Sequence, residues 1–213
     1  LLAEPWTSQR AGKLLEELQA LSTTGSPSGR RPELIVWPEN PAPFYYYNDP
    51  QFRSAVEATA RRENAHLLLG TVAYRDRSQR EPLNSAVLVG PDGAEIARYD
   101  KMKLVPFGEF VPWPLGLLVE KITREAGDYV AGDRVVVAPA SQGGIGTFIC
   151  YESVFGDTVR RFARSGAGVL VNISNDAWFG RSAARDQHLL IARMRAMENR
   201  RWLLRAANTG LTA

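Results

Sequence analysis

Residues 145–150 read Ile145-Gly146-Thr147-Phe148-Ile149-Cys150, an apolar run with the length of a short buried strand. A helical pattern follows at residues 154–164, and another apolar run follows at residues 168–174. We expect the helix to begin near Ser153, which places the positive end of its dipole near the Cys150 sulfur. A strand therefore ends, and a helix begins, at the only cysteine of the chain.

Strands and helices alternate in this way along the whole sequence. Helices are expected at residues 14–21, at 50–60 behind the cap Asp49, at 115–124 and at 185–199. Strands are expected at residues 33–37, 66–74, 85–90, 95–99, 134–138 and 202–207, of which the third and fourth form a hairpin. This order predicts a single α/β domain over residues 1–213, in which helices cover the sheet.

The composition fits one buried core. The chain has 213 residues, of which 45% are hydrophobic and 23% are charged. Its 26 basic and 23 acidic residues are mixed along the sequence, so no basic stripe predicts a nucleic-acid partner. The single cysteine excludes an internal disulfide, and the longest nearly uncharged apolar run, at residues 110–119, is too short to span a membrane. Because the sequence begins with leucine and ends without an obvious terminating signal, we expect a piece of a longer protein.

A thiol is a weak nucleophile at neutral pH unless other groups assist it. It needs a base to take its proton, a cation to stabilise the oxyanion that its attack creates, and a third group to orient the cation. Glu39 follows Pro38 directly after an apolar strand, where partial burial makes a carboxylate a useful base. Lys101 lies in an irregular segment, and Glu109 lies eight residues later in the same loop. These residues are the candidates for the three tasks.

Each candidate also has an ordinary structural interpretation. A single cysteine in a strand is more often a small buried apolar residue, and glutamate and lysine are most often solvated. We interpret His66, in an apolar strand, and His188, in a helix, as structural, with a Cys–His enzyme as the alternative. The sequence has no phosphate-binding loop, no histidine pair at metal spacing and no Gly-x-Ser-x-Gly motif, so we expect neither a metal nor an organic cofactor.

Five segments, taken in order, resemble the motifs of the nitrilase superfamily. They are Trp37-Pro38-Glu39, Tyr99-Asp100-Lys101, Leu104-Val105-Pro106-Phe107-Gly108-Glu109-Phe110-Val111-Pro112, Cys150-Tyr151-Glu152 and Asn175-Asp176-Ala177-Trp178-Phe179-Gly180. The long block after Lys101 and the Cys-Tyr-Glu triplet are most similar to the catalytic domain of the bacterial apolipoprotein N-acyltransferases. The resemblance runs from about residue 34 to residue 210 and implies an αββα sandwich. It also implies a fold incomplete at both ends, because that family's domain has a strand before the first helix, further strands after residue 210, and an adjoining bundle of membrane spans.

The same resemblance implies a role for each matched residue. The roles are acyl-accepting nucleophile for Cys150, general base for Glu39, oxyanion stabiliser for Lys101, holder of Lys101 for Glu109, supporting group for Glu152, and a further oxyanion donor for the backbone N–H of Tyr151. The implied reaction moves a fatty acyl chain from a phospholipid, through a thioester, to the N-terminal amine of a diacylglyceryl-cysteine lipoprotein. The implied location is the inner membrane of a bacterium, with the catalytic domain on the periplasmic side at the membrane surface.

Two apolar segments, residues 44–47 and 110–118, follow the loops of Glu39 and Lys101 and fit the mouth of a lipid-binding site. Together with the motif at residues 175–180, they predict a substrate lip of four aromatic side chains, namely Tyr46, Phe110, Trp113 and Trp178. Core packing of these side chains is the alternative interpretation.

Two other functions fit the same residues. A soluble carbon-nitrogen hydrolase, an amidase or nitrilase, uses the identical catalytic set with water as the acceptor and needs no hydrophobic lip. A non-catalytic nitrilase-fold domain serves binding or assembly, but such a domain usually loses a member of the Glu-Lys-Cys set, and this chain keeps all three. The acyltransferase is therefore the function that the sequence favours.

Overall fold

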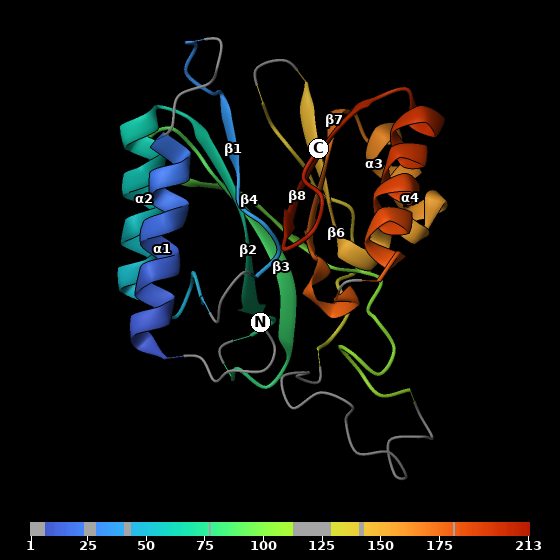
Figure 1. Ribbon diagram of the computed structural model, residues 1–213, viewed down its shortest axis with the longest axis horizontal. Coiled ribbons are helices and arrows are strands. Elements are labelled where there is room, and N and C mark those ends of the chain that lie inside the picture. The colour runs from blue at the N-terminus through green and yellow to red at the C-terminus, as the bar shows by residue number, and fades with distance from the viewer. Residues whose placement is uncertain are drawn as a thin grey trace.

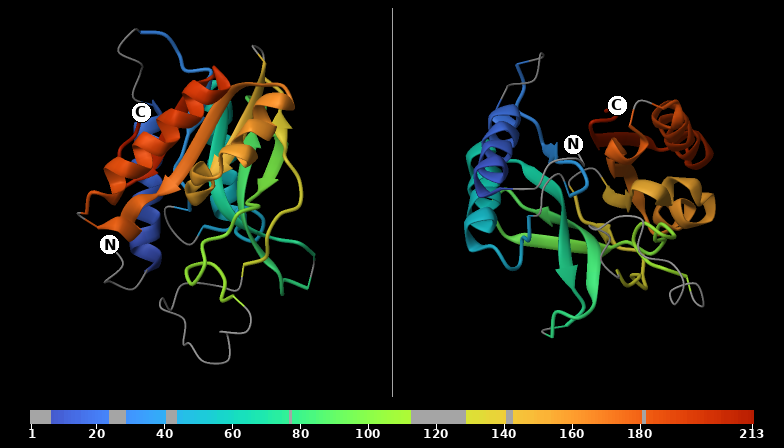
Figure 2. Two further views of the ribbon diagram at one scale, coloured as in Figure 1. Left: turned by 90° about the vertical axis from the view of Figure 1, so that its right-hand side faces the viewer. Right: turned by 60° about the horizontal axis from the view of Figure 1, so that its bottom comes forward.

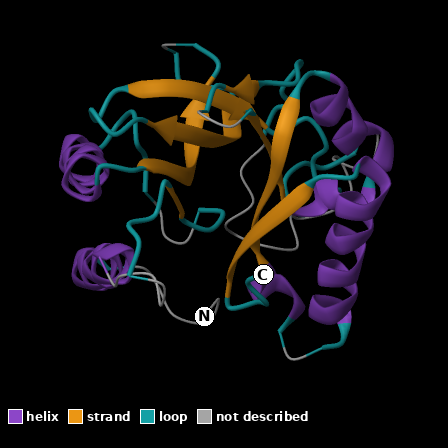
Figure 3. Cartoon of the chain, turned by 90° about the horizontal axis from the view of Figure 1, so that it is seen from above, coloured by secondary structure: helices purple, strands orange, loops and turns teal. Residues whose placement is uncertain are grey.

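Two four-stranded sheets pack face to face, and a pair of helices covers the outer face of each (Figure 1). The computed structural model describes residues 7–23, 29–40, 44–76, 78–112, 129–140, 143–180 and 182–213. Seen from above in Figure 3, both sheets lie between the two helix pairs. The predicted αββα sandwich is confirmed.

The elements follow the alternation expected from the sequence. The helices are α1 (Ser8–Thr23), α2 (Pro50–Glu63), α3 (Gly156–Arg164) and α4 (Ala184–Asn199). The strands are β1 (Leu34–Val36), β2 (His66–Tyr74), β3 (Pro82–Val89), β4 (Glu95–Asp100), β5 (Val137–Ala138), β6 (Gly144–Ile149), β7 (Ala167–Asn175) and β8 (Trp202–Asn208). Two 3-10 turns, η2 (Cys150–Val154) and η3 (Asp176–Phe179), directly follow β6 and β7.

Strand direction determines which loops meet. In the first sheet, ordered β1-β2-β3-β4, β1 pairs with β2 in parallel and β3 pairs with both its neighbours in antiparallel, so β1, β2 and β4 run the same way. In the second sheet, ordered β5-β6-β7-β8, the last three strands are parallel. The loops after β1 and β4 therefore leave one edge of the first sheet, and the turns after β6 and β7 leave one edge of the second.

Alternation along the strands divides the core in two. In β2, Leu68 faces the second sheet and packs with Phe148 and Ile173, whereas Leu67 and Leu69 face α2. Because successive side chains of a strand point to opposite faces, one strand supplies both cores. Figure 2 shows the resulting layers, with α1 and α2 on one side and α3 and α4 on the other.

Local signals in the sequence located most element boundaries. Asp49 caps α2 through bonds of 3.0 Å from the backbone N–H groups of Gln51 and Phe52, as its position before Pro50 predicts. The strand expected at residues 134–138 is shorter, reduced to β5. The helix expected at residues 115–124 lies outside the described residues.

Gly70 in β2 lies directly under the loop that carries Glu39. A Cβ atom at this position would come within 2.6 Å of the Asn40 nitrogen and 2.8 Å of the Glu39 Cα. These are backbone atoms, which cannot rotate away, so only glycine lets the loop cross the strand this closely.

We predict that Gly70→Ala displaces the Glu39 loop and lowers the free energy of unfolding by about 1–3 kcal/mol. Gly12→Ala is the matched control, because Gly12 lies within α1 and an added Cβ meets nothing within 4 Å. That control should raise the stability by about 0.5–1 kcal/mol. Thermal and urea unfolding measure both effects, and a Gly70→Ala protein as stable as the wild type would contradict the prediction.

Candidate active site

The three predicted catalytic residues line one cavity of about 1120 Å³ between the sheet edges. Lys101 directly follows β4 and Cys150 directly follows β6, while Glu39 lies in the loop after β1. The two edges are joined by a hydrogen bond of 2.8 Å from the backbone N–H of Asn175, at the end of β7, to Glu39 Oε2. The topology thus brings Glu39 close to Cys150, which lies 111 positions later in the sequence.

Lys101 is a buried cation held between two carboxylates. Its side chain is 1% exposed, and its Nζ lies 2.9 Å from Glu109 Oε1 and 3.5 Å from Glu39 Oε1. Burial lowers the pKa of Lys101, but the carboxylates of Glu39 and Glu109 outweigh that effect and hold the pKa above its ordinary value. The ammonium therefore stays charged at the base of the cavity, where a developing oxyanion needs a positive partner.

Asn84 of β3 is the residue that joins the two carboxylates, and it was missed in the sequence. Its Nδ2 donates to Glu39 Oε1 at 2.8 Å and to Glu109 Oε1 at 2.7 Å. Its backbone carbonyl also accepts a 2.8 Å bond from the Lys101 N–H. The available signal was a polar pair, Asn84 and Ser85, within an otherwise apolar strand, since buried polar side chains require partners.

Cys150 is a resting thiol in a strained turn. It is 8% exposed, and its φ of 49° lies in the left-handed region that residues other than glycine rarely adopt. Burial, together with the Glu39 carboxylate, raises the pKa of the thiol to about 12, while Lys101 and a hydrogen bond with Ser174 oppose the rise. The thiol is therefore protonated at neutral pH and needs a base when it attacks.

The expectation that a helix begins beside the Cys150 sulfur is wrong. The first residues after β6 form the 3-10 turn η2, and α3 begins only at Gly156, beyond the predicted start near Ser153. The sharp turn at Cys150 delays the helix, so the positive end of its dipole is not at the sulfur. Activation of the thiol must come from side chains instead.

Glu152 is a fully buried carboxylate that binds both catalytic loops. Its Oε1 accepts bonds from the Tyr99 hydroxyl at 2.6 Å and the Met102 N–H at 2.8 Å, and its Oε2 accepts from the Ile149 N–H at 2.8 Å. Burial raises the pKa of Glu152, and these hydrogen bonds oppose the rise. Tyr151, its neighbour, lines the cavity and packs edge-to-face on Phe155.

The structure does not place two of the four predicted lip residues at the cavity. Tyr46 is 0% exposed because its ring packs in the core with α2, so its neighbour Tyr45 lines the cavity instead. Phe110 is not among the described residues that line the cavity. Its carbonyl closes a tight turn by accepting from the Phe107 N–H at 2.7 Å. Trp178 lines the cavity and is 45% exposed, and Trp113 lies outside the described residues.

The histidines occupy different surroundings. His66 is partly buried at the start of β2, away from the cavity lining. His188 is buried beside the site, and its Nε2 lies 3.1 Å from the carbonyl oxygen of Cys150. That contact is with the backbone of the cysteine. The described residues include no group of three or more His, Cys, Asp or Glu side chains placed to hold a metal ion.

Comparisons with known proteins identify the family of the chain. The chain is 39% identical over 212 residues to an apolipoprotein N-acyltransferase of Geobacter metallireducens, covering 99% of this chain and 40% of the relative. It is 39% identical over 183 residues to the enzyme of the same name from Methylococcus capsulatus, covering 84% of this chain and 35% of that one. The chain thus spans well under half the length of these curated relatives.

Solved structures show the same fold. An amidase from Nesterenkonia sp. superposes with a TM-score of 0.66 at 19% identity, covering 99% of this chain and 76% of the amidase. A carbon-nitrogen hydrolase from Helicobacter pylori superposes with a TM-score of 0.63 at 20% identity, covering 93% of this chain and 66% of the hydrolase. The carbon-nitrogen hydrolase family profile matches residues 5–212, so the expected resemblance is confirmed and the chain belongs to the carbon-nitrogen hydrolase family.

Proposed function

We propose that this chain is the catalytic domain of an apolipoprotein N-acyltransferase. It moves a fatty acyl chain from a phospholipid to the N-terminal amine of a diacylglyceryl-cysteine lipoprotein. The observation that carries the proposal is the buried Lys101, held by Glu39 and Glu109 in the cavity that Cys150 also lines. The names of the relatives supply the acyl transfer and the apolipoprotein acceptor, and the resemblance to their family supplies the phospholipid donor. The cavity volume lies slightly above the usual range for small-molecule sites, which leaves room for a lipid.

In the first half-reaction, Glu39 takes the proton of the Cys150 thiol, and the sulfur attacks the ester carbonyl of the phospholipid. A C–S bond forms as the carbonyl π electrons move to oxygen, and Lys101 and the Tyr151 N–H stabilise that oxyanion. The oxyanion collapses, the C–O bond to glycerol breaks, and Glu39 returns the proton to the departing alkoxide. A lysophospholipid leaves, and a thioester remains on Cys150.

In the second half-reaction, the lipoprotein amine attacks the thioester carbonyl. Glu39 accepts a proton from the amine, and the same donors stabilise the second oxyanion. The C–S bond then breaks, an amide forms, and the proton passes from Glu39 to the sulfur. Glu109 and Glu152 act as positioning residues, because their contacts are with Lys101 and with the catalytic loops.

The site faces the bilayer in this proposal, on the periplasmic side of a bacterial inner membrane. Tyr45 and Trp178 line the cavity with the apolar side chains of Leu14 and Ile191, a surface suited to acyl chains. None of the helices in the described part of the chain has the length and hydropathy to cross a membrane.

We predict that the intact protein, mixed with phospholipid vesicles and no lipoprotein, accumulates a fatty acyl mass on Cys150. A transferase must protect the thioester from water until the amine arrives. Mass spectrometry of the intact protein measures the adduct, which should disappear when an amine acceptor is added and be absent from Cys150→Ala. Steady release of free fatty acid without a trapped adduct would instead assign the chain to the amidase or nitrilase alternative.

We predict that Glu109→Gln lowers the rate of this acylation by about 10- to 100-fold while the protein stays folded. Both Glu109 oxygens accept hydrogen bonds, Oε1 from Lys101 and Asn84 and Oε2 from the Val105 N–H, so an amide NH₂ in either place faces a donor. Glu81→Gln is the control, because its half-exposed carboxylate pairs with exposed Arg75 at 3.4 Å. Wild-type acylation by Glu109→Gln would remove Glu109 from the mechanism.

We predict that Glu39→Gln abolishes acyl transfer but makes Cys150 easier to alkylate. The Glu39 carboxylate raises the pKa of the thiol, so its neutralisation lowers that pKa and increases the thiolate fraction at a given pH. The pH profile of iodoacetamide alkylation should move to lower pH by about one pH unit. A profile that stays in place or moves to higher pH would show that Glu39 does not act on the thiol.

A further inference from the structure

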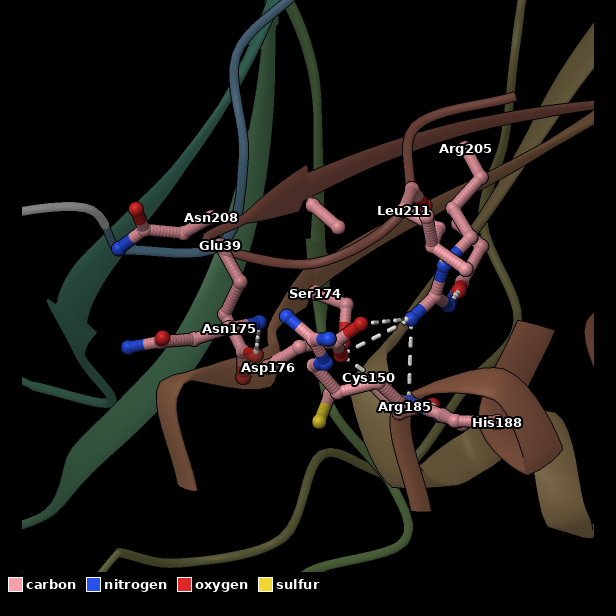
Figure 4. Close-up of polar contacts among 12 residues, drawn as sticks. Glu39, Cys150, Ser174, Asn175, Asp176, Arg185, His188, Arg205, Asn208 and Leu211 are labelled. Atoms are coloured by element: carbon pink, nitrogen blue, oxygen red, sulfur yellow. Dashed lines mark hydrogen bonds and ion pairs between the residues drawn. The ribbon is translucent and has the colours of Figure 1, made fainter. Parts of the chain in front are cut away.

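A buried polar network lies beside Cys150 and is separate from the Glu-Lys-Cys set (Figure 4). It consists of Asp176, at the start of η3, His188 of α4 and Arg205 of β8, all buried. Arg205 Nη2 donates to the two Asp176 oxygens at 2.9 and 2.8 Å and lies 3.0 Å from His188 Nδ1. The Ser174 hydroxyl donates to Asp176 Oδ1 at 2.7 Å.

The partners of His188 determine where its proton lies. Nε2 is 3.1 Å from the carbonyl oxygen of Cys150, and a carbonyl oxygen can only accept, so Nε2 must carry a hydrogen and donate it. On the other side of the ring, Nδ1 lies 3.0 Å from the Arg205 guanidinium, which can only donate, and 3.1 Å from Asp176 Oδ1, which can only accept; neither contact alters the role of Nε2. The network therefore fixes the imidazole as a donor to the backbone of the nucleophile.

The accepting carbonyl belongs to the peptide bond that joins Cys150 to Tyr151. In a planar trans peptide the C=O and N–H groups are rigidly coupled and point to opposite sides, so a fixed carbonyl fixes the direction of the Tyr151 N–H. A hydrogen bond to the C=O also polarises the amide and strengthens its N–H as a donor. The left-handed φ of Cys150 needs such support, because the turn is unfavourable by itself.

We propose that His188 is a positioning residue that orients and polarises the Cys150–Tyr151 peptide, so that the Tyr151 N–H stabilises the oxyanion formed at Cys150. Asp176 and Arg205 hold the imidazole for this task. The inference rests on the proposed function, because it requires acylation of Cys150. It gives the second histidine of the chain a task that is neither proton transfer with the thiol nor simple packing.

Two reactions of the same thiol separate this role from a structural one. Acylation by p-nitrophenyl butyrate passes through an oxyanion: the sulfur bonds to the carbonyl carbon, and collapse expels p-nitrophenolate. Alkylation by iodoacetamide forms a C–S bond with loss of iodide and develops no oxyanion. In the intact protein, we expect His188→Ala to slow acylation by about 10- to 100-fold and alkylation by less than about threefold.

His188→Gln provides a second variant, because its side-chain amide can place an N–H near the position of Nε2, and we expect its acylation rate to lie between those of wild type and His188→Ala. His66→Gln is the matched control, since His66 also contacts a backbone carbonyl, that of Glu33 at 3.3 Å, but does so outside the cavity lining. Its two rates should equal those of the wild type.

The outcomes distinguish the two proposals. If His188→Ala loses both reactions in equal proportion, or neither, His188 is structural and only this inference fails. A well-folded His188→Gln protein that is acylated no faster than His188→Ala also counts against the inference. A wild type that is alkylated but never acylated by the ester contradicts the proposed function itself.

Discussion

The site depends on a buried ammonium that must not be left without counter-charges. Lys101 is removed from water, and removing a charge from water is costly unless opposite charges and hydrogen bonds replace the solvent. Glu39 and Glu109 supply the charge, and Asn84 ties the two carboxylates together. Because these groups come from different strands and loops, satisfying one cation requires the first sheet to be correctly paired from β1 to β4.

The second sheet is joined to this cluster by two carboxylates. Glu39 accepts from the backbone of Asn175 after β7, and Glu152 accepts both from the loop after β4 and from the end of β6. Each of these carboxylates is therefore shared between the sheets. The contacts fix Cys150 relative to Lys101, which is the kind of preorganisation that the proposed reaction requires.

Beside Cys150, a second buried cluster is polar, where apolar packing is usual. Asp176 is anionic there: burial raises its pKa, but its hydrogen-bond contacts with His188, Ser174 and Arg205 lower it to about 2. A hydrogen-bonded ionic cluster is rigid, and this rigidity supports the left-handed backbone conformation of Cys150. The cavity beside it is lined both by apolar side chains, such as Leu14 and Ile191, and by charged ones, such as Arg10 and Lys13.

The sequence by itself determined the elements and the chemical groups. Capping at Asp49, the hairpin before Lys101 and the apolar runs are local patterns, and they predicted an α/β domain in which helices cover the sheet, while the resemblance to the nitrilase superfamily implied the αββα sandwich. The order of Glu39, Lys101 and Cys150 predicted the site, because each follows a strand whose end is visible in the sequence.

Only the tertiary structure decided which neighbours those groups have. Asn84 reaches Glu39 across 45 residues of sequence, and His188 lies beside Cys150 because α4 packs on the turn after β6. It also placed Tyr46 in the core and Tyr45 in the cavity, and it replaced the expected helix start after Cys150 with a 3-10 turn. The physical reason is that strand register and packing between distant segments set these contacts, and a one-residue change in register sends a side chain to the opposite face.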